Sequence, residues 1–587
     1  MGVNRFPPGD ARAGRAPQRR HHVVAWAVAG IWIAALVVAT GAWARTPLRD
    51  APPAWEAGDR GDIPPPKPRD PSLLRDAFDE NVVRPGGRFF NPVRLVRHLG
   101  GLFGTEIAHS AADINDLDEA LNSTWFTNRI GIFPRSPEQV ARGPVATDGP
   151  DRGGPWRVTR AKTQGVTPGF NVNDNRGDTY VIKFDPPCCP GGPSAAGVVT
   201  GRLLHAAGYN VPQDFVVTFR RDDVIVNEGV TLTDRDGMKR AMTEADLDSM
   251  LTRVVPEPDG SYRAIASRFL AGKPLGPFDW KGRRKDDPFD RVKHENRREL
   301  RGLRMICAWL GHFDMKQHNT LDMWIEDGSR RYVKHYLIDF ASTLGMGAGG
   351  PFPMANMEYG ADLSAAFGRL FSFGLHEDAW RRLERPSKFP EVGYFEAERF
   401  EPMEWKPLQP NAAFANMTER DGYWAAKIVS AFTDERIAAA VAEGKYHDPE
   451  AARYVARTLA ARRDKIARIW FDRVPPLDFF VFEEGTLRFH DLGAERGVYP
   501  GTTPRYRVRV AACDAGRNAG GWSDWREASA PRFDLADVAA RPPDDEASPS
   551  RRPFLVVEAS VDRGDGWRGP IRAYVSRANG YVVAVDR

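Results

Sequence analysis

Cysteine is scarce in this sequence, and neither sign of charge dominates it. Four cysteines in 587 residues are too few for a disulfide framework, so packing has to stabilise the fold. The formal net charge is +4, from 82 basic and 78 acidic residues, which is too weak a field to hold nucleic acid non-specifically. No nucleic-acid partner is therefore expected. Hydrophobic residues make up 42% and charged residues 27%, as in ordinary globular proteins of two or three domains.

One long stretch, residues 23–44, has no charge at all. It is long enough to span a bilayer, and arginines within residues 1–22 favour an N-terminus on the cytoplasmic side. The same stretch can be a secretory signal, because Ala42 and Ala44 fit a small-x-small cleavage site. A membrane anchor and a secreted protein cleaved near Ala44 remain alternatives. Both place the bulk of the chain outside the cytoplasm, on the periplasmic or cell-surface side.

The segments on either side of the central part have distinct patterns. Residues 45–72 are rich in proline, which favours extended structure, so we expect a tether. Residues 73–155 mix short helical patterns with turns and are predicted to be an N-terminal extension. In the C-terminal part Tyr506–Val510 alternates strictly, and the Asn-Gly pair at 579–580 is typical of a hairpin turn. Residues 475–587 are therefore predicted to form a small all-β module.

The clearest chemical signal is a run of the form His-x-Asp-x-Lys-x-x-Asn, made by His312, Asp314, Lys316 and Asn319. Phosphoryl transfer needs a carboxylate that accepts the nucleophile's proton and oxygen ligands that hold magnesium on the phosphates. Asp314 and Asn319 are close enough in sequence for one loop to aim both inward. Asp339 ends an apolar, strand-like run and is expected to bring a second hard oxygen ligand beside Asn319. The alternative is a polar turn, or a set of stray metal ligands.

This run resembles the catalytic loop of protein kinases, His-Arg-Asp-Leu-Lys-x-x-Asn. The apolar run that ends at Asp339 is similar to the entry into their Asp-Phe-Gly segment, with Ala341 in place of the glycine. The chain looks most like an atypical member, of HipA-like or lipid-kinase-like type. The resemblance implies ATP and Mg²⁺ as cofactors, with Asp314 as the base and Lys316 as a neutraliser of phosphoryl charge. It assigns Asn319 and Asp339 to the metal.

The resemblance implies a bilobal kinase-like domain over residues 156–474 and an α+β fold. Its N-lobe would cover about residues 156–276 and its C-lobe about residues 277–474. The strand-like run 179–184 contains Lys183 and is similar to the Val-Ala-Ile-Lys strand of the family, whose lysine holds the nucleotide phosphates. Lys183 is therefore a candidate nucleotide-binding residue.

Two features depart from the family pattern. Gly165-Val-Thr-Pro-Gly169 is the candidate loop over the phosphates, which makes Gly165 and Gly169 candidate nucleotide-binding residues, but it lacks the Gly-x-Gly-x-x-Gly pattern. Residues 194–208 have helical spacing but contain no glutamate to pair with Lys183, as the family requires. Either Glu228 or another carboxylate substitutes for it, or Lys183 is unpaired.

Residues 289–310 are predicted to form one helix that leads directly into the Asp314 loop. Leu303 and Cys307 lie on its apolar face. Its basic residues, among them Arg298 and Arg301, are expected on a solvated face or against an acidic or phosphorylated partner.

Two functions are compatible with these patterns. The first is an ATP- and magnesium-dependent phosphotransferase with an unknown protein, lipid or glycan acceptor. The second is a non-catalytic envelope binding protein built on a degenerate kinase-like fold. The retained Asp314, Asn319 and Asp339 favour the first. The absent helix glutamate favours the second, as does the expected external location, where ATP is scarce.

Overall fold

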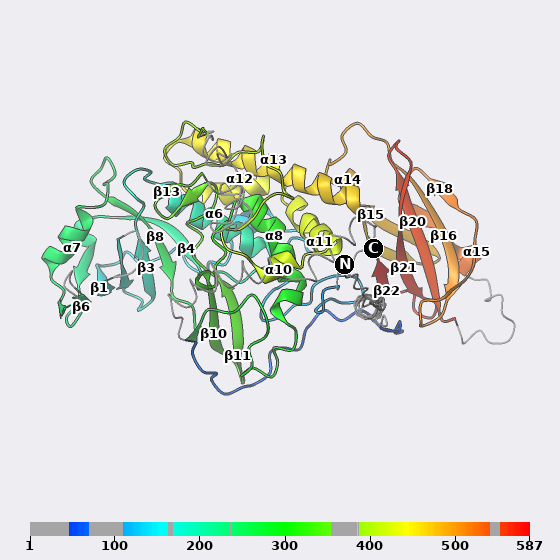
Figure 1. Cartoon of the computed structure of the whole chain (residues 1–587), viewed down its shortest axis with the longest axis horizontal. Coiled ribbons are helices and arrows are strands. Elements are labelled where there is room, and N and C mark those ends of the chain that lie inside the picture. Colours follow the sequence, from blue (N-terminus) through cyan, green and yellow to red (C-terminus); the bar gives the residue numbers. More distant parts are fainter. Residues whose placement is uncertain are drawn as a thin grey trace, which may run out of the picture.

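The structure is a computed structural model (Figure 1) that describes residues 46–69, 110–161, 168–233, 238–353, 384–385, 387–539 and 552–587. The uncharged stretch 23–44 and Gly165 lie outside these ranges. Within them, no helix combines the length and the hydrophobicity needed to cross a membrane. Helices occur together with largely antiparallel sheets, so the predicted α+β class is confirmed.

The first large element is a six-stranded sheet, ordered β4-β8-β3-β2-β1-β5. Its strands are β1 (Trp156–Ala161), β2 (Gly169–Asn173), β3 (Thr179–Lys183), β4 (Asp214–Phe219), β5 (Val224–Val226) and β8 (Tyr262–Arg268). Strand β5 runs parallel to β1, and the other neighbours are antiparallel. One face forms a core that buries Phe170, Tyr180 and Ile182. The predicted strand leading to Lys183 is confirmed as β3.

The opposite face of this sheet packs against helix α6 (Gly192–Ala207). The predicted helix is confirmed and begins two residues before Ser194. Side chains alternate along a strand, so Lys183 leaves β3 on this face while Ile182 points into the core. Gly197 comes so close to the sheet that a Cβ there would lie 3.0 Å from Ile265 Cδ1. A smaller unit extends this end of the molecule (Figure 1); it contains β6 (Thr231–Thr233), β7 (Lys239–Ala241) and α7 (Glu244–Leu251).

The middle of the chain contains most of the helices and a second, three-stranded sheet ordered β11-β10-β9. Its strands are β9 (Lys273–Gly276), β10 (Thr320–Asp327) and β11 (Arg330–Leu337), and the main helices are α8 (Arg298–Leu310), α10 (Ala412–Ala415), α11 (Glu419–Ser430), α12 (Asp434–Ala442) and α13 (Pro449–Arg473). A short hairpin joins β12 (Met346–Gly347) to β13 (Gly350–Pro351), and α5 (Pro137–Arg142) lies in the N-terminal extension. Helix α13 begins where Asp448 caps it, accepting from the backbone N–H of Glu450 at 2.8 Å.

Helix α8 is shorter than the predicted helix 289–310, and its basic residues Arg298 and Arg301 are buried, whereas Arg304 is half-buried. It begins at Arg298, which pairs with Asp118 at 2.6 Å and with Asp421 at 2.9 Å. Arg301 also contacts Asp421, at 3.5 Å. The expected solvated face is therefore wrong for Arg298 and Arg301, whereas Arg291 and Lys293, before the helix begins, are exposed. Acidic residues distant in the sequence surround these guanidinium groups and allow them to be buried.

From Leu477 onward the chain consists mainly of strands. These are β14 (Leu477–Glu483), β15 (Thr486–Asp491), β16 (Arg505–Cys513), β17 (Ala519–Trp522), β18 (Arg526–Ala528), β19 (Arg532–Asp534), β20 (Phe554–Asp562), β21 (Trp567–Ser576) and β22 (Val582–Asp586), with short helices α14 (Leu492–Glu495) and α15 (Ala536–Ala539). They form a β14-β15-β19 sheet and a β17-β16-β20-β21-β22 sheet, in which β18 also pairs with β16. The predicted Asn-Gly hairpin is confirmed between β21 and β22, where Gly580 has a φ of 72°.

The end of the chain is buried against the helices. The Arg587 guanidinium pairs with Asp478 at 2.6 Å and donates to the Tyr423 hydroxyl at 3.1 Å. Lys427 pairs with Asp478 at 3.1 Å and also with Glu119 of the N-terminal extension. Burial disfavours the ionised form of Asp478, but Arg587 and Lys427 outweigh it and lower the pKa of this carboxyl. The strands from Leu477 onward thus share one core with the helices.

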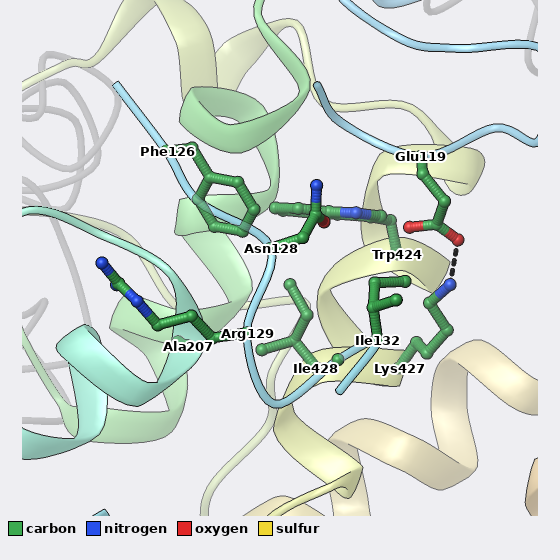
Figure 2. A pocket seen from close by; sticks show the side chains of 10 residues that line it. Glu119, Phe126, Asn128, Arg129, Ile132, Ala207, Trp424, Lys427 and Ile428 are labelled. Atoms are coloured by element: carbon green, nitrogen blue, oxygen red, sulfur yellow. Dashed lines mark hydrogen bonds and ion pairs between the residues drawn. The ribbon is translucent and has the colours of Figure 1, made fainter. Parts of the chain in front are cut away.

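Figure 2 shows the Glu119–Lys427 pair beside a hollow between the N-terminal extension and α11. Phe126 and Trp424 line the hollow, with their ring centroids 5.2 Å apart. The hollow has no room for a water molecule, so it is a packing feature and not a ligand site.

Replacing Arg587 tests this buried network. Arg587→Ala leaves Asp478 buried with one cation fewer, so we expect a loss of about 3–5 kcal/mol in the free energy of unfolding. Urea unfolding of the full chain followed by circular dichroism measures it. The matched control is Arg568→Ala, because Arg568 forms an exposed pair with Asp565 and should have a much smaller effect. Equal effects of the two substitutions would contradict a structural role for the C-terminal arginine.

Candidate functional site

The Asp314 loop follows helix α8 directly and is closed by its own residues. Helix α8 ends at Gly311, whose φ of 61° lies in the left-handed region that glycine tolerates. The Asn319 side chain then donates from Nδ2 to the carbonyl oxygen of Asp314 at 2.7 Å. Lys316 Nζ donates to Asp314 Oδ2 at 2.9 Å. The other carboxylate oxygen, Oδ1, is buried and has no hydrogen-bond partner in the described part of the chain.

His312 anchors this loop in the core. Its side chain is buried, and burial of the charged imidazolium lowers the pKa of His312 to about 4. At neutral pH it is therefore an uncharged ring. The ring packs edge-on against Phe340, with centroids 5.8 Å apart. Phe340 in turn lies beside α6, where a Cβ on Gly201 would be 3.7 Å from its Cδ2 atom. Packing thus links the loop to the helix that covers the lysine face of the sheet.

Asp339 stands two residues beyond β11 and faces the first sheet. Its carboxylate Oδ1 lies 3.2 Å from Lys183 Nζ. The backbone N–H of Ile338 donates to the carbonyl of Asn319 at 3.0 Å, which places Asp339 beside the Asp314 loop. Asp339 has a φ of 62°, a conformation that non-glycine residues rarely adopt and that surrounding structure has to impose. Such outliers are concentrated at functional sites.

The structure thus brings together five of the seven predicted site residues in two linked groups, Lys183 with Asp339 and Asp314 with Lys316 and Asn319. The sixth, Gly169, begins β2 and pairs in register with Lys183, so its backbone lies next to the lysine. The seventh, Gly165, is outside the described residues. The functional roles of these residues stay predictions; their proximity is observed.

A carboxylate that the sequence did not single out shares the sheet face of Lys183. In the register, Val181 pairs with Ser267 and Ser267 with Asp214, so Asp214 points to the same side as Lys183. Asp214 is 5% exposed, and its Oδ1 has no hydrogen-bond partner among the residues described. Burial raises the pKa of Asp214, and a hydrogen bond with Ser267 and the nearby Lys183 charge oppose that rise only in part.

This arrangement bears on the missing helix glutamate. Helix α6 contains no acidic residue, whereas Asp214 projects from β4 toward the same helix. A Cβ on Gly201 of α6 would lie 3.9 Å from Asp214 Oδ2. One sequence signal could have identified Asp214. It is an aspartate at the start of an otherwise apolar strand, where a charge is unusual unless it has a partner.

The donor set near Asp339 suits a hard cation. Mg²⁺ is commonly bound by one or two protein oxygen ligands together with substrate phosphates. Asp339 supplies a carboxylate that is partly exposed, and the Asn319 amide turns its Nδ2 toward Asp314, which leaves Oδ1 as its ligand atom. No cluster of three or more His, Cys, Asp or Glu side chains that could hold a metal alone occurs in the described ranges. These residues fit a metal that arrives with phosphates.

Comparisons with known proteins leave the family open. No family model matches the chain, and no curated protein matches it. A Helicobacter pylori proinflammatory kinase, CtkA, is 9% identical over 52% of this chain and 93% of its own, with a TM-score of 0.27. A Golgi casein kinase with Mn/ADP bound is 10% identical over 48% of this chain and 74% of its own, with a TM-score of 0.22. Likenesses this low carry no weight, so the function has to be inferred from the residues of this chain.

Asp214→Asn tests the burial of this carboxyl. Its folded-state pKa lies above the ordinary 3.8, so the folded state binds the proton more tightly than the unfolded chain does. Ionisation of Asp214 therefore costs the folded state free energy. This cost is fully present above the folded pKa and vanishes below about pH 3.8. We expect Asp214→Asn to stabilise the protein by on the order of 1 kcal/mol at pH 7 and to match wild type in acid.

Asp174 is the matched control for that measurement. It is also buried, but hydrogen bonds from the backbone N–H groups of Asp151 and Asp178 outweigh burial and lower its pKa. Asp174→Asn should therefore destabilise the protein at pH 7, with the difference shrinking as the pH falls through the lowered pKa. Chemical unfolding from pH 8 down to pH values below 3.8 reports both. If both substitutions destabilise the protein at pH 7, the raised pKa of Asp214 is contradicted.

Proposed function

We propose that this chain is an ATP- and Mg²⁺-dependent phosphotransferase with a protein-kinase-like arrangement of its catalytic groups. The observation that carries the proposal is the Lys183–Asp339 contact of 3.2 Å, made next to the Asp314–Asn319 loop. It joins the end of a strand in one sheet to the segment following a strand of another. A lysine, a hard-ligand pair and a carboxylate that can accept a proton are the groups that phosphoryl transfer requires.

Each group has a role that follows from its position. Lys183 would hold the nucleotide phosphates, with the backbone of Gly169 beside it. Asp339 and Asn319 would hold Mg²⁺, which when bound neutralises charge on the phosphates. Asp314 Oδ1, buried and without a partner among the described residues, would accept the proton of the attacking hydroxyl. Lys316, on the other oxygen, orients the carboxylate and would offset negative charge on the transferring group.

Asp214 is proposed as the carboxylate that replaces the missing helix glutamate. It lies on the face of the sheet that carries Lys183, and the Lys183 charge acts on its carboxyl. An ionised Asp214 would attract the Lys183 ammonium toward the sheet and limit where its Nζ can reach. This is a positioning role, since Asp214 is buried and cannot touch a nucleotide.

For the acceptor and the cellular location, we propose only a general class. The acceptor is a protein, lipid or glycan hydroxyl that reaches Asp314. The uncharged stretch 23–44 supports a membrane anchor with the bulk of the chain on the periplasmic or cell-surface side, with secretion after cleavage near Ala44 as the alternative.

Two observations support a second function. Helix α6 offers no acidic residue, and Lys183 contacts Asp339, a proposed metal ligand. A chain that has lost turnover could retain this contact as a purely structural ion pair. It would then be a non-catalytic binding protein of the cell envelope that uses the kinase-like frame and the C-terminal strands as a binding surface.

Substitution of the proposed base separates the two functions. Asp314→Asn keeps the shape of the side chain but cannot accept a proton at neutral pH. Transfer of the ATP γ-phosphoryl group, to water or to the chain itself, should fall by about two or more orders of magnitude. Nucleotide affinity should persist, because Asp314 meets the acceptor and not the phosphates.

The control is Asp327→Asn, an exposed aspartate at the end of β10. It should leave transfer and affinity unchanged. If the wild-type chain transfers no phosphoryl group and Asp314→Asn alters nothing, the binding-protein function is the better account.

A further inference from the structure

Two adjacent cysteines lie outside the proposed site, in the loop between β3 and α6. Cys188 Sγ and Cys189 Sγ are 2.6 Å apart, although neighbouring side chains of an extended chain point to opposite sides. Tight turns produce this: the Cys189 N–H donates to the Pro186 carbonyl, and the Gly192 N–H to the Cys189 carbonyl, both at 3.1 Å. The backbone therefore holds two sulfur atoms face to face, which raises their effective concentration toward each other.

The two thiols differ in accessibility. Cys188 is exposed and Cys189 is buried. Burial, together with the neighbouring Cys188 sulfur, raises the pKa of the Cys189 thiol and disfavours its thiolate, which is the reactive form. A reagent in solution therefore meets Cys188 first. Cys307 and Cys513 are also free and buried, and serve as internal references.

We propose that Cys188 and Cys189 form a redox-active dithiol, which a small-molecule disulfide oxidises to a disulfide between the two adjacent residues. The Cys188 thiolate attacks R–S–S–R, forming a mixed disulfide and releasing RS⁻, which takes up the proton that Cys188 lost. Cys189 then gives up its proton and attacks Cys188 Sγ, which forms the intramolecular bond and releases a second RSH. Two protein thiols are oxidised and one R–S–S–R is reduced to two RSH.

A disulfide between these adjacent residues should be easily reduced again. Adjacent Cα atoms are about 3.8 Å apart across a trans peptide bond. Ordinary disulfides join Cα atoms about 4.4–6.8 Å apart, so a bridge between neighbours is strained. Strained and exposed disulfides are the ones that are easily reduced again, and these serve regulation more often than structure.

The dithiol touches the hairpin that follows Asp339. The Cys188 thiol donates toward the Gly349 carbonyl at 3.7 Å, and a Cβ on Gly350 would lie 2.7 Å from Cys188 Sγ. Oxidation removes the S–H donor and draws this sulfur toward Cys189, so the β12–β13 hairpin loses a contact. The redox state of the pair is thereby transmitted to the segment between Asp339 and residue 351.

Thiol mapping tests the proposal. The full chain, reduced and freed of excess thiol, is treated with oxidised glutathione, and remaining thiols are alkylated before peptide mass spectrometry. We expect both thiols of the 188–189 peptide to be lost together, without retained glutathione, and to return with dithiothreitol. Cys189→Ser should retain glutathione on Cys188, and Cys188→Ser should not react. Hydrogen exchange in the peptide covering 346–351 should be severalfold faster in the oxidised wild type.

Three results would overturn the proposal. The first is a wild-type chain that stops at the glutathione adduct or does not react. The second is oxidation of Cys307 or Cys513 at the same rate, which would mean reaction of an unfolded chain. The third is unchanged exchange of the hairpin, which would contradict its coupling to the thiols. The reaction needs no nucleotide, so its outcome is independent of the proposed phosphoryl transfer.

Discussion

The contact between Lys183 Nζ and Asp339 Oδ1, 3.2 Å long, is the interaction on which the proposed site depends. Both side chains are partly exposed, so the pair itself adds little to the folding free energy. Its importance lies in what fixes its two ends. Strand pairing of β3 with β2 and β8 holds the lysine, while the Ile338–Asn319 hydrogen bond and the buried Phe340 hold the aspartate. The core thus determines the positions of groups that water can reach.

Features with local signals could be predicted from the sequence. Short-range patterns of apolar, glycine and capping residues predicted three of these features. They are the strand ending at Lys183, helix α6 with its end at Gly208, and the cap of α13. The hairpin at 579–580 follows from its Asn-Gly pair. The spacing of Asp314 and Asn319 likewise predicted that one loop would hold both, and the Asn319 side chain closes that loop.

Features that depend on distant partners could not be predicted. Asp214 reaches the face of Lys183 only through the register of β4 on β8 and of β8 on β3. Arg298 looked like a solvated helix residue because its partners, Asp118 and Asp421, lie far away in the sequence. The burial of Arg587 likewise depends on tertiary packing, and no periodicity of hydrophobic residues predicts it.

The most direct test of the central claim is nucleotide affinity of the full chain with and without Mg²⁺, measured for wild type and Asp339→Asn. The wild type should bind ATP at least about tenfold more tightly with Mg²⁺, a difference of about 1.4 kcal/mol. Asp339→Asn removes a charged metal ligand, so that gain should disappear while the fold is retained. No measurable ATP affinity in the wild type, or an equal Mg²⁺ effect in both proteins, would contradict the account and leave the Asp314 loop as a polar turn.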